Sequence, residues 1–394
     1  MKIAALIHAI QAHNGLVDER ISGLGEKISY RLVHTGQHYD KNMSDTFFEE
    51  LGIPAPDVNL GCGGGTQAEQ TAHIMVAFEK ELLEHPTDVV LVVGDVTSTM
   101  ACSIVAKKLN TKVCHVEAGI RSWDLTMPEE INRMVTDSLA DYMFTTSDVA
   151  NRNLIRQGAE LVESLAFSDE SSLKVEGGKS LPEDKYAFER VPQKVWHVGN
   201  VMIDTLLANR SRFRKPEVWD ELGLKEKEFV VMTMHRPANV DEENHLRAMM
   251  EQIIDNVHGL PVIFPIHPRT AKLFYGLWGD EAELAKRFPN LHIVEPLGYL
   301  EFNYLVERAK AVVTDSGGIT EETTVMGVPC ITLRDNTERP ETCTVGTNEL
   351  IGTKPEAIKP ALDKLFAGEW KKGAIPELWD GHAAERIIAI LAEL

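Results

Sequence analysis

The sequence predicts an α/β fold made of two doubly wound, Rossmann-like domains. Short apolar runs rich in β-branched residues alternate with longer amphipathic stretches, a pattern typical of parallel strands that are buried on both faces and connected by helices. The alternation runs once through the first half and begins again near Phe229. A chain of 394 residues is also too long for one ordinary hydrophobic core and suits two domains.

The first series predicts a domain over residues 1–199. Six apolar runs are expected to form strands, at 3–7, 31–35, 89–93, 113–116, 142–145 and 195–198. Apolar residues that recur every three or four positions predict helices between them, at 66–83, 97–109, 129–139 and 147–157. A polar insertion over 160–192 contains Gly and Ser, and its length indicates either a surface excursion or a functional loop.

The second series predicts a domain over residues 200–381, with a hinge near 200–222. Its strands are expected at 229–234, 262–265, 292–294, 311–314 and 330–333. Its helices are expected at 242–257, 300–308, 318–326 and 356–366. The last segment, 382–394, is amphipathic and predicts a helix that packs across either domain.

Composition excludes several classes of function. The formal net charge of −20 disfavours nucleic acid and anionic membranes as partners. No apolar stretch approaches the roughly 20 residues needed to cross a bilayer, and the first residues lack the features of a signal peptide. The five cysteines are far apart, which argues against a zinc site and a disulfide framework. We therefore expect a cytoplasmic protein with buried, reduced cysteines.

Carboxylates follow two strands that are expected to be neighbours. Asp95 follows the strand at 89–93 and Glu117 follows the strand at 113–116. Ligands of open parallel sheets bind at the carboxyl ends of the strands, and paired carboxylates suit general acid–base catalysis. The structural alternatives are a helix N-cap for Asp95 and an ion pair between Glu117 and Arg121.

The Pro-Glu-Glu segment at 128–130 adds a third carboxylate near the same strand ends. Thr126 and Glu129 have the spacing of a capping box, which explains one of the two glutamates. It leaves Glu130 unexplained and does not exclude catalysis by Glu129. Such an acidic site suits proton transfer or a metal, and the ligand spacing of a metal site is not apparent in the sequence.

Polar groups also follow the strands of the second half. His235 and Arg236 follow the strand at 229–234, and His267 follows the strand at 262–265. The segment Asp-Ser-Gly-Gly at 315–318 joins a strand to a helix, so its backbone N–H groups and the helix dipole favour a diphosphate. Glu322 lies one turn further on and suits ribose hydroxyls.

Seven segments together resemble the non-hydrolysing UDP-N-acetylglucosamine 2-epimerase family. They are HTGQHYD at 34–40, GDVTST at 94–99, HVEAGIR at 115–121, PEEINR at 128–133, HRP at 235–237, DSGG at 315–318 and RDNTERPE at 334–341. The resemblance covers most of the chain. It implies the GT-B architecture, in which two Rossmann-like domains face each other across a cleft that binds a UDP-sugar.

The resemblance also implies a reaction and a set of residues. Elimination of UDP would give a 2-acetamidoglucal, and UDP would add back after protonation of C2 on the opposite face. The family's catalytic residues match Asp95, Glu117, Glu129 and His235. The implied substrate-binding residues are Gln37, His38, Arg133, Arg236, His267, Ser316, Gly317, Gly318, Glu322 and Arg339. No cofactor or metal is implied, whereas a homodimer and a role in polysaccharide precursor synthesis are.

One departure from the family pattern keeps other functions open. The family's first strand leads into Gly-x-Arg-Pro and a Lys, whose cations contact the diphosphate, and this chain has Ile10 and Gly15 at the matched positions. Losing one such contact costs about 1.5–3 kcal/mol, or roughly ten- to a hundredfold in binding. The alternatives are a related UDP-2-acetamido sugar as substrate, a hydrolysing epimerase, a GT-B glycosyltransferase, or a catalytically impaired UDP-sugar-binding protein.

Overall fold

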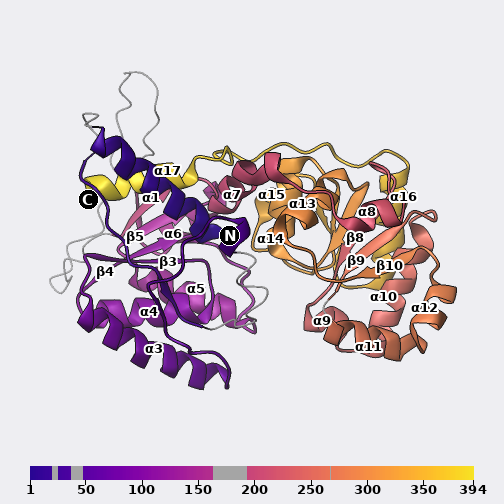
Figure 1. The fold of residues 1–394 in the computed structure, drawn as a ribbon, viewed down its shortest axis with the longest axis horizontal. Helices are drawn as coiled ribbons and strands as arrows, with labels where there is room; N and C mark the ends of the chain where they lie inside the picture. Colours follow the sequence, from indigo (N-terminus) through magenta and orange to yellow (C-terminus); the bar gives the residue numbers. More distant parts are fainter. Residues whose placement is uncertain (20–24, 37–47, 163–192, 267) are drawn as a thin grey trace. The chain divides into compact units, whose positions relative to one another are not determined.

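The computed structural model describes residues 1–19, 25–36, 48–162, 193–266 and 268–394 (Figure 1). It confirms the α/β class. The chain divides into two compact units. Unit 1 comprises Met1–Gly64, Ser122–Asp124 and Gly199–Leu394, and unit 2 comprises Gly65–Arg121 and Leu125–Val198. This division places the first 64 residues with the C-terminal part of the chain rather than with residues 65–198.

Unit 1 contains a six-stranded, all-parallel sheet in the order β10-β9-β8-β11-β12-β13. The strands are β8 (Val230–Thr233), β9 (Val262–Pro265), β10 (Leu291–Val294), β11 (Ala311–Thr314), β12 (Cys330–Thr332) and β13 (Asn348–Leu350). The first five confirm the expected strands. The polar edge strand β13 was not predicted, because Asn-Glu-Leu has no apolar run.

Helices cover both faces of this sheet, as a doubly wound fold requires. Val230 and Met232 of β8 belong to one apolar core, which the side chains of α10 and α16 complete. Val231 points into the opposite core, formed with α8 and α13. The helices are α7 (Val201–Asn209), α8 (Glu217–Glu221), α9 (Pro237–Val240), α10 (Glu243–Asn256), α11 (Pro268–Trp278), α12 (Glu281–Arg287), α13 (Tyr299–Arg308), α14 (Gly317–Met326), α15 (Pro340–Thr344) and α16 (Ile358–Phe366).

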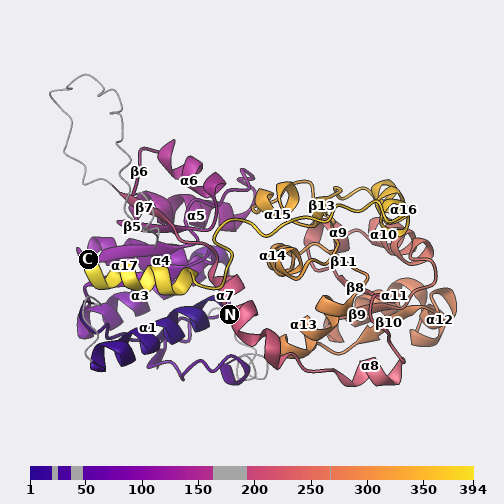
Figure 2. The same ribbon diagram turned by 90° about the horizontal axis from the view of Figure 1, so that it is seen from above.

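The strand predicted at residues 3–7 is wrong, because this segment belongs to helix α1 (Lys2–Asp18). Its buried residues include Ile7, Ile10 and His13, which recur every three residues and so mark one helical face. Helix α1 packs against α7 and against α17 (Ala383–Glu393), as both views show (Figures 1 and 2). Unit 1 also holds a small parallel sheet of β1 (Val33–His34) and β2 (Val58–Asn59).

Unit 2 contains a five-stranded parallel sheet in the order β3-β4-β5-β7-β6. The strands are β3 (Val89–Val93), β4 (Lys112–Val116), β5 (Tyr142–Thr145), β6 (Glu160–Leu161) and β7 (Lys194–His197). The helices are α3 (Gln67–Glu84), α4 (Thr97–Lys108), α5 (Pro128–Leu139) and α6 (Asp148–Ile155). Val93 pairs with Val116 at the ends of β3 and β4, so the residues that follow both strands share one sheet edge.

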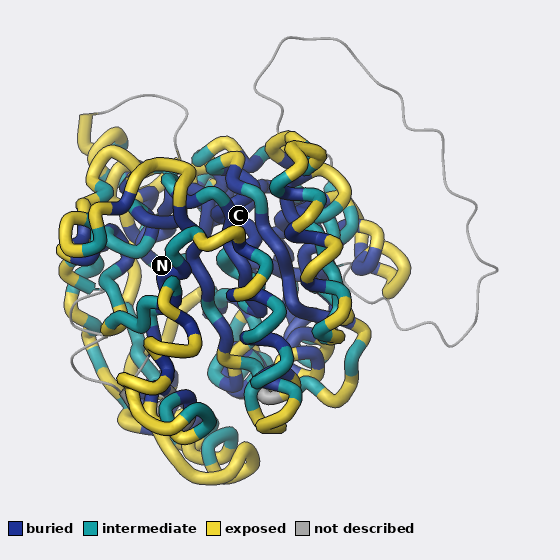
Figure 3. The backbone as a smooth tube through the Cα atoms, turned by 90° about the vertical axis from the view of Figure 1, so that its right-hand side faces the viewer, coloured by how far each residue is buried: buried dark blue, intermediate teal, exposed yellow. Residues whose placement is uncertain are grey.

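Figure 3 colours the backbone by burial. The central strands β5 and β11 are buried throughout, whereas the edge strand β6 is exposed. All five cysteines are free and four are buried, as predicted. No helix within the described ranges is long and apolar enough to span a membrane. The insertion predicted at 160–192 lies outside the described residues from 163 onward.

Candidate active site

Asp95 lies where the strand-end rule places it, directly after β3. Its carboxylate accepts a hydrogen bond from Nε of Arg133 at 3.0 Å and a second, shorter one from Nη2. The side-chain amide of Asn132 donates to the Asp95 carbonyl at 2.9 Å. The N-cap of α4 is Val96, so the alternative of Asp95 as a helix cap is wrong. Helix α5 therefore holds both the backbone and the side chain of Asp95.

Glu117 follows β4 at the same edge and is 3% exposed. Its φ of 71° is left-handed, a conformation that costs energy for a residue other than glycine and that clusters at functional sites. The alternative ion pair with Arg121 is wrong, because Arg121 Nη1 lies 2.6 Å from a carboxylate oxygen of Asp137. Glu117 is thus held in a strained turn beside the strand that carries Asp95.

Helix α5 brings the third carboxylate. Glu129 is exposed in its first turn, whereas Glu130 is fully buried and accepts a hydrogen bond from Arg133 at 2.8 Å. The capping box predicted at Thr126 and Glu129 is wrong, since Met127 is the N-cap without a side-chain bond. A capping box is present instead at Thr66 and Glu69 of α3.

Arg133 was predicted to bind substrate, but its guanidinium bridges two carboxylates of its own unit. It contacts Asp95 and Glu130, and its side chain is only 6% exposed. This arrangement explains Glu130, which the sequence left without a role. Arg133 therefore orients the Asp95 carboxylate, and its contact with substrate stays a prediction.

In unit 1, Asp315 organises the loop that follows β8. Its buried carboxylate accepts backbone hydrogen bonds from His235 at 3.0 Å and Arg236 at 2.8 Å, and one from the Asn239 amide at 3.1 Å. His235 Nδ1 lies 2.9 Å from the other oxygen. Burial acts to raise the pKa of Asp315, but the His235 ring and these N–H groups hold the pKa below its ordinary value. The ring of His235 is therefore fixed, and its side chain stays 63% exposed.

The Gly-Gly turn begins helix α14, as predicted. A Cβ added to Gly317 would meet nothing closer than Arg334 Nη1 at 3.7 Å, and one added to Gly318 would meet Met202 at 3.8 Å. Neither glycine has a positive φ. Because neither backbone strain nor internal crowding requires glycine here, the two positions suit the close approach of a ligand to the helix N-terminus.

A cavity of about 170 Å³ lies beside this turn within unit 1. Its lining includes Ser316 and Gly318 from the turn, Glu322 from the next helical turn, and Tyr299 and Phe302 from α13. Pockets for drug-sized ligands usually measure roughly 300–1,000 Å³. The cavity therefore has room for only part of a drug-sized ligand.

Glu322 is the buried acid of this cavity. The phenol of Tyr299 donates a hydrogen bond to Glu322 Oε1 at 3.0 Å. Burial raises the pKa of Glu322 from 4.5 to about 7, with the nearby Glu321 acting in the same direction. Near neutral pH the carboxyl group therefore exchanges between its charged and neutral forms.

Glu322→Gln is expected to stabilise the unliganded protein at pH 8. The raised pKa means that the fold disfavours the carboxylate, a penalty that is absent below pH 4.5 and complete above pH 7. The difference between 4.5 and about 7 corresponds to about 3 kcal/mol as an upper value. Thermal unfolding should show a higher Tm for the variant at pH 8 and an unchanged Tm at pH 4. Equal Tm values at pH 8 would contradict the buried, costly charge.

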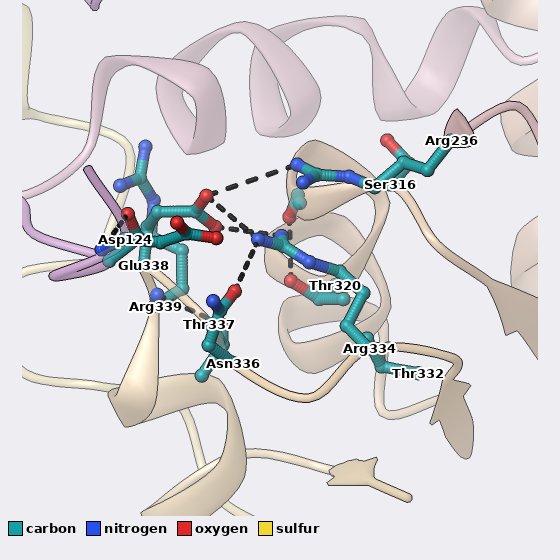
Figure 4. A network of polar contacts seen from close by, with 12 residues as sticks. Asp124, Arg236, Ser316, Thr320, Thr332, Arg334, Asn336, Thr337, Glu338 and Arg339 are labelled. Atoms are coloured by element: carbon teal, nitrogen blue, oxygen red, sulfur yellow. Dashed lines mark hydrogen bonds and ion pairs between the residues drawn. The ribbon is translucent and has the colours of Figure 1, made fainter. Parts of the chain in front are cut away.

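A network of ion pairs surrounds the turn (Figure 4). Arg334 donates two hydrogen bonds to Glu338, at 2.7 and 2.8 Å, and one to Asn336. Arg236 Nη2 lies 3.9 Å from Glu338. Arg339, which is also predicted to bind substrate, donates to Glu321 with its side chain 11% exposed. Of these arginines, Arg236 is 30% exposed and is the better placed to meet an anion.

Several predicted positions give no site geometry. Gln37, His38 and His267 lie outside the described residues. Ile10 and Gly15 do not replace the cations of a phosphate-binding turn, since both lie within helix α1. No group of three or more His, Cys, Asp or Glu suited to a metal ion occurs among the described residues.

Comparison with known proteins relates the chain to one family. Residues 24–392 match the model of the UDP-N-acetylglucosamine 2-epimerase family. The UDP-N-acetylglucosamine 2-epimerase of Methanocaldococcus jannaschii is 36% identical over 99% of this chain and 95% of its own length. The UDP-2,3-diacetamido-2,3-dideoxy-D-glucuronate 2-epimerase of Pseudomonas aeruginosa is 35% identical over 94% of this chain and 93% of its own length.

The solved structures support the same family. The crystal structure of the M. jannaschii UDP-GlcNAc 2-epimerase in complex with UDP-GlcNAc and UDP aligns with a TM-score of 0.79 and 36% identity. The alignment covers 100% of this chain and 96% of that one. The chain therefore belongs to the UDP-N-acetylglucosamine 2-epimerase family, whose members are isomerases of sugar nucleotides with the GT-B fold.

Proposed function

We propose that the protein interconverts UDP-GlcNAc and UDP-ManNAc by eliminating and re-adding UDP. A base removes the C2 proton as the bond from C1 to the UDP oxygen breaks, which leaves a C1–C2 double bond. Protonation of C2 from the opposite face and return of UDP to C1 complete the inversion. The observation that carries the proposal is the placement of Asp95 and Glu117 after two paired strands of a family member.

The carboxylates of unit 2 supply the proton transfers. Asp95 and Glu129 are assigned to proton removal and delivery at C2, and Glu117 shares or tunes these protons. Epimerisation needs a base and an acid on opposite faces of the sugar, and carboxylates with different surroundings suit this division. Asp95 is hydrogen-bonded to Arg133, whereas Glu129 is exposed. The two carboxylates therefore have the different surroundings that suit a base and an acid.

Unit 1 holds the nucleotide. Backbone N–H groups at Ser316, Gly317 and Gly318 receive the diphosphate at the N-terminus of α14, and Arg236 adds a cation. Glu322 accepts hydrogen bonds from the ribose, and His235 stabilises the departing diphosphate. Gln37, His38 and His267 are assigned further substrate contacts.

Gly318→Ala is expected to weaken UDP binding about ten- to a hundredfold while preserving the fold. The new methyl group would occupy the space through which the diphosphate approaches the backbone, but would meet the protein only at 3.8 Å. Calorimetric titration with UDP and thermal unfolding of the same samples measure both effects. Gly327→Ala in the C-cap of α14 is a contrasting variant, expected to lower stability because Gly327 has φ 69°. Unchanged UDP affinity in Gly318→Ala would remove this turn from the site.

The identity of the sugar substrate is tested by incubating the protein with UDP-GlcNAc and, separately, with UDP-2,3-diacetamido-glucuronate. The second substrate is included because of the P. aeruginosa relative. NMR and chromatography should show UDP-ManNAc from the first incubation. Turnover of the uronate alone would assign the other sugar, and free ManNAc with UDP would indicate a hydrolysing epimerase. UDP binding without any product would favour a catalytically impaired binding protein.

We further propose a cytoplasmic homodimer that supplies an activated sugar for polysaccharide synthesis. Family membership supports this assignment, and sedimentation measures the oligomeric state.

A further inference from the structure

We propose that His115 and Asp137 are positioning residues that fix the Asp95 turn through a buried imidazolium. The inference rests on the proposed function for its catalytic consequence and on geometry alone for the charge. Both residues belong to unit 2, and neither contacts the reacting groups in the assignments above.

The two side chains form a continuous buried link from α5 to the end of β3. Asp137 Oδ1 lies 2.6 Å from Nδ1 of His115, and His115 Nε2 lies 2.9 Å from the carbonyl oxygen of Gly94. The side chains of His115 and Asp137 are both 0% exposed. Gly94 immediately precedes Asp95. The His115 ring is therefore hydrogen-bonded to the peptide group that joins Gly94 to Asp95.

The partners of the ring determine its charge. A backbone carbonyl oxygen only accepts hydrogen bonds, so Nε2 of His115 must carry a proton to bond Gly94. Asp137 forms a buried ion pair with Arg121, whose guanidinium is always charged and so stabilises the ionised form of the carboxyl group. Asp137 is therefore a carboxylate that only accepts hydrogen bonds, and Nδ1 of His115 must also carry a proton. A ring with both nitrogens protonated is an imidazolium.

Asp137 holds the second catalytic turn as well. Its other oxygen accepts the backbone N–H of Gly119 at 3.1 Å and an ion pair from Arg121. Gly119 ends the turn that begins with Glu117. Asp137 and His115 therefore tie the turns of two catalytic carboxylates to α5, the helix that carries Glu129. A small misplacement of such groups costs up to about a hundredfold in rate.

Two substitutions at His115 separate its contacts. In His115→Gln the amide nitrogen takes the place of Nε2 and keeps the bond to Gly94. In His115→Asn the amide takes the place of Nδ1 and keeps only the contact with Asp137. We expect kcat to fall about tenfold in His115→Gln and about a hundredfold in His115→Asn, with KM and the UDP Kd within twofold of wild type. His85→Asn, at an exposed histidine after α3, is the matched control and should leave all three constants unchanged.

The charge itself is tested in the wild-type protein without substrate. Long-range proton–nitrogen NMR of histidine labelled with ¹⁵N, assigned by loss of one signal set in His115→Gln, should show two protonated ring nitrogens for His115 in the folded protein. A neutral tautomer of His115 would overturn the imidazolium. Equal kcat losses in the two variants would overturn the role of the Gly94 contact. Absence of epimerase activity in wild type, with the NMR signature present, would reject the proposed function and leave the charged pair standing.

Discussion

Asp95→Asn is expected to lower kcat for epimerisation by about 10²–10⁴-fold, the usual contribution of a positioned acid or base. Asparagine has nearly the same shape and retains an oxygen that accepts from Arg133, which keeps its bond to Glu130 at 2.8 Å. The fold should therefore survive. The UDP Kd should stay within twofold, because the nucleotide contacts assigned above belong to unit 1.

Asp148→Asn is the matched control for this experiment. Asp148 lies on α6 of the same unit, with its side chain 65% exposed and paired with Arg152. Exposed ion pairs contribute little to stability, so kcat and Tm should be nearly unchanged. A similar small effect in Asp95→Asn would show that Asp95 does not transfer a proton.

Asp315→Asn is expected to lower kcat/KM by about 10²–10³-fold and to raise the UDP Kd. The carboxylate accepts bonds from the His235 ring and from three N–H groups, and an amide would turn its NH₂ group toward some of these donors. Loss of such buried, charge-assisted bonds costs about 1.5–3 kcal/mol each at most. The His235 ring would then lose its fixed orientation, as would the backbone N–H of Arg236.

The loss of stability in Asp315→Asn should depend on pH, and the pKa of Asp315 determines the direction. The lowered pKa of Asp315 means that its stabilisation is present above 3.8 and is lost as the pH falls through the folded-state pKa. Asp315→Asn should therefore lower the Tm at pH 7 and change it less at pH 3.

A double variant separates positioning from a general loss of stability. If Asp315 acts through His235, the combination with His235→Asn should cost little more than the larger single change. Additive losses in kcat/KM would indicate that Asp315 acts independently of His235.

The sequence predicted the strand ends better than the side-chain partners. Asp95, Glu117 and the 315–318 turn lie where the parallel-sheet rule placed them, because short apolar strands and Gly-Gly turns are local signals. The partners were harder to predict. Asp137 lies 22 positions from His115, and only the packing of α5 on β4 brings them together.

The wrong strand at residues 3–7 and the unforeseen partners of two arginines also arise from features that a short segment does not show. Residues 3–7 resemble a strand when taken as five apolar residues, and only their continuation to His13 shows the helical period. Arg133 and Arg339 were predicted to bind substrate, and a sequence does not show which carboxylates of the same chain also face them. The structure pairs them with Asp95 and Glu130, and with Glu321. Tyr299, which bonds Glu322 from another helix, carried no local signal.

The most direct test is proton NMR of the purified protein with UDP-GlcNAc in D₂O. Removal and return of the C2 proton through the unit 2 carboxylates predicts UDP-ManNAc that carries deuterium at C2, and the same label in recovered UDP-GlcNAc. Asp95→Asn should lose most of this exchange while still binding UDP. Epimerised product that retains its original C2 hydrogen would contradict the account, because no carboxylate would then have exchanged the proton with solvent.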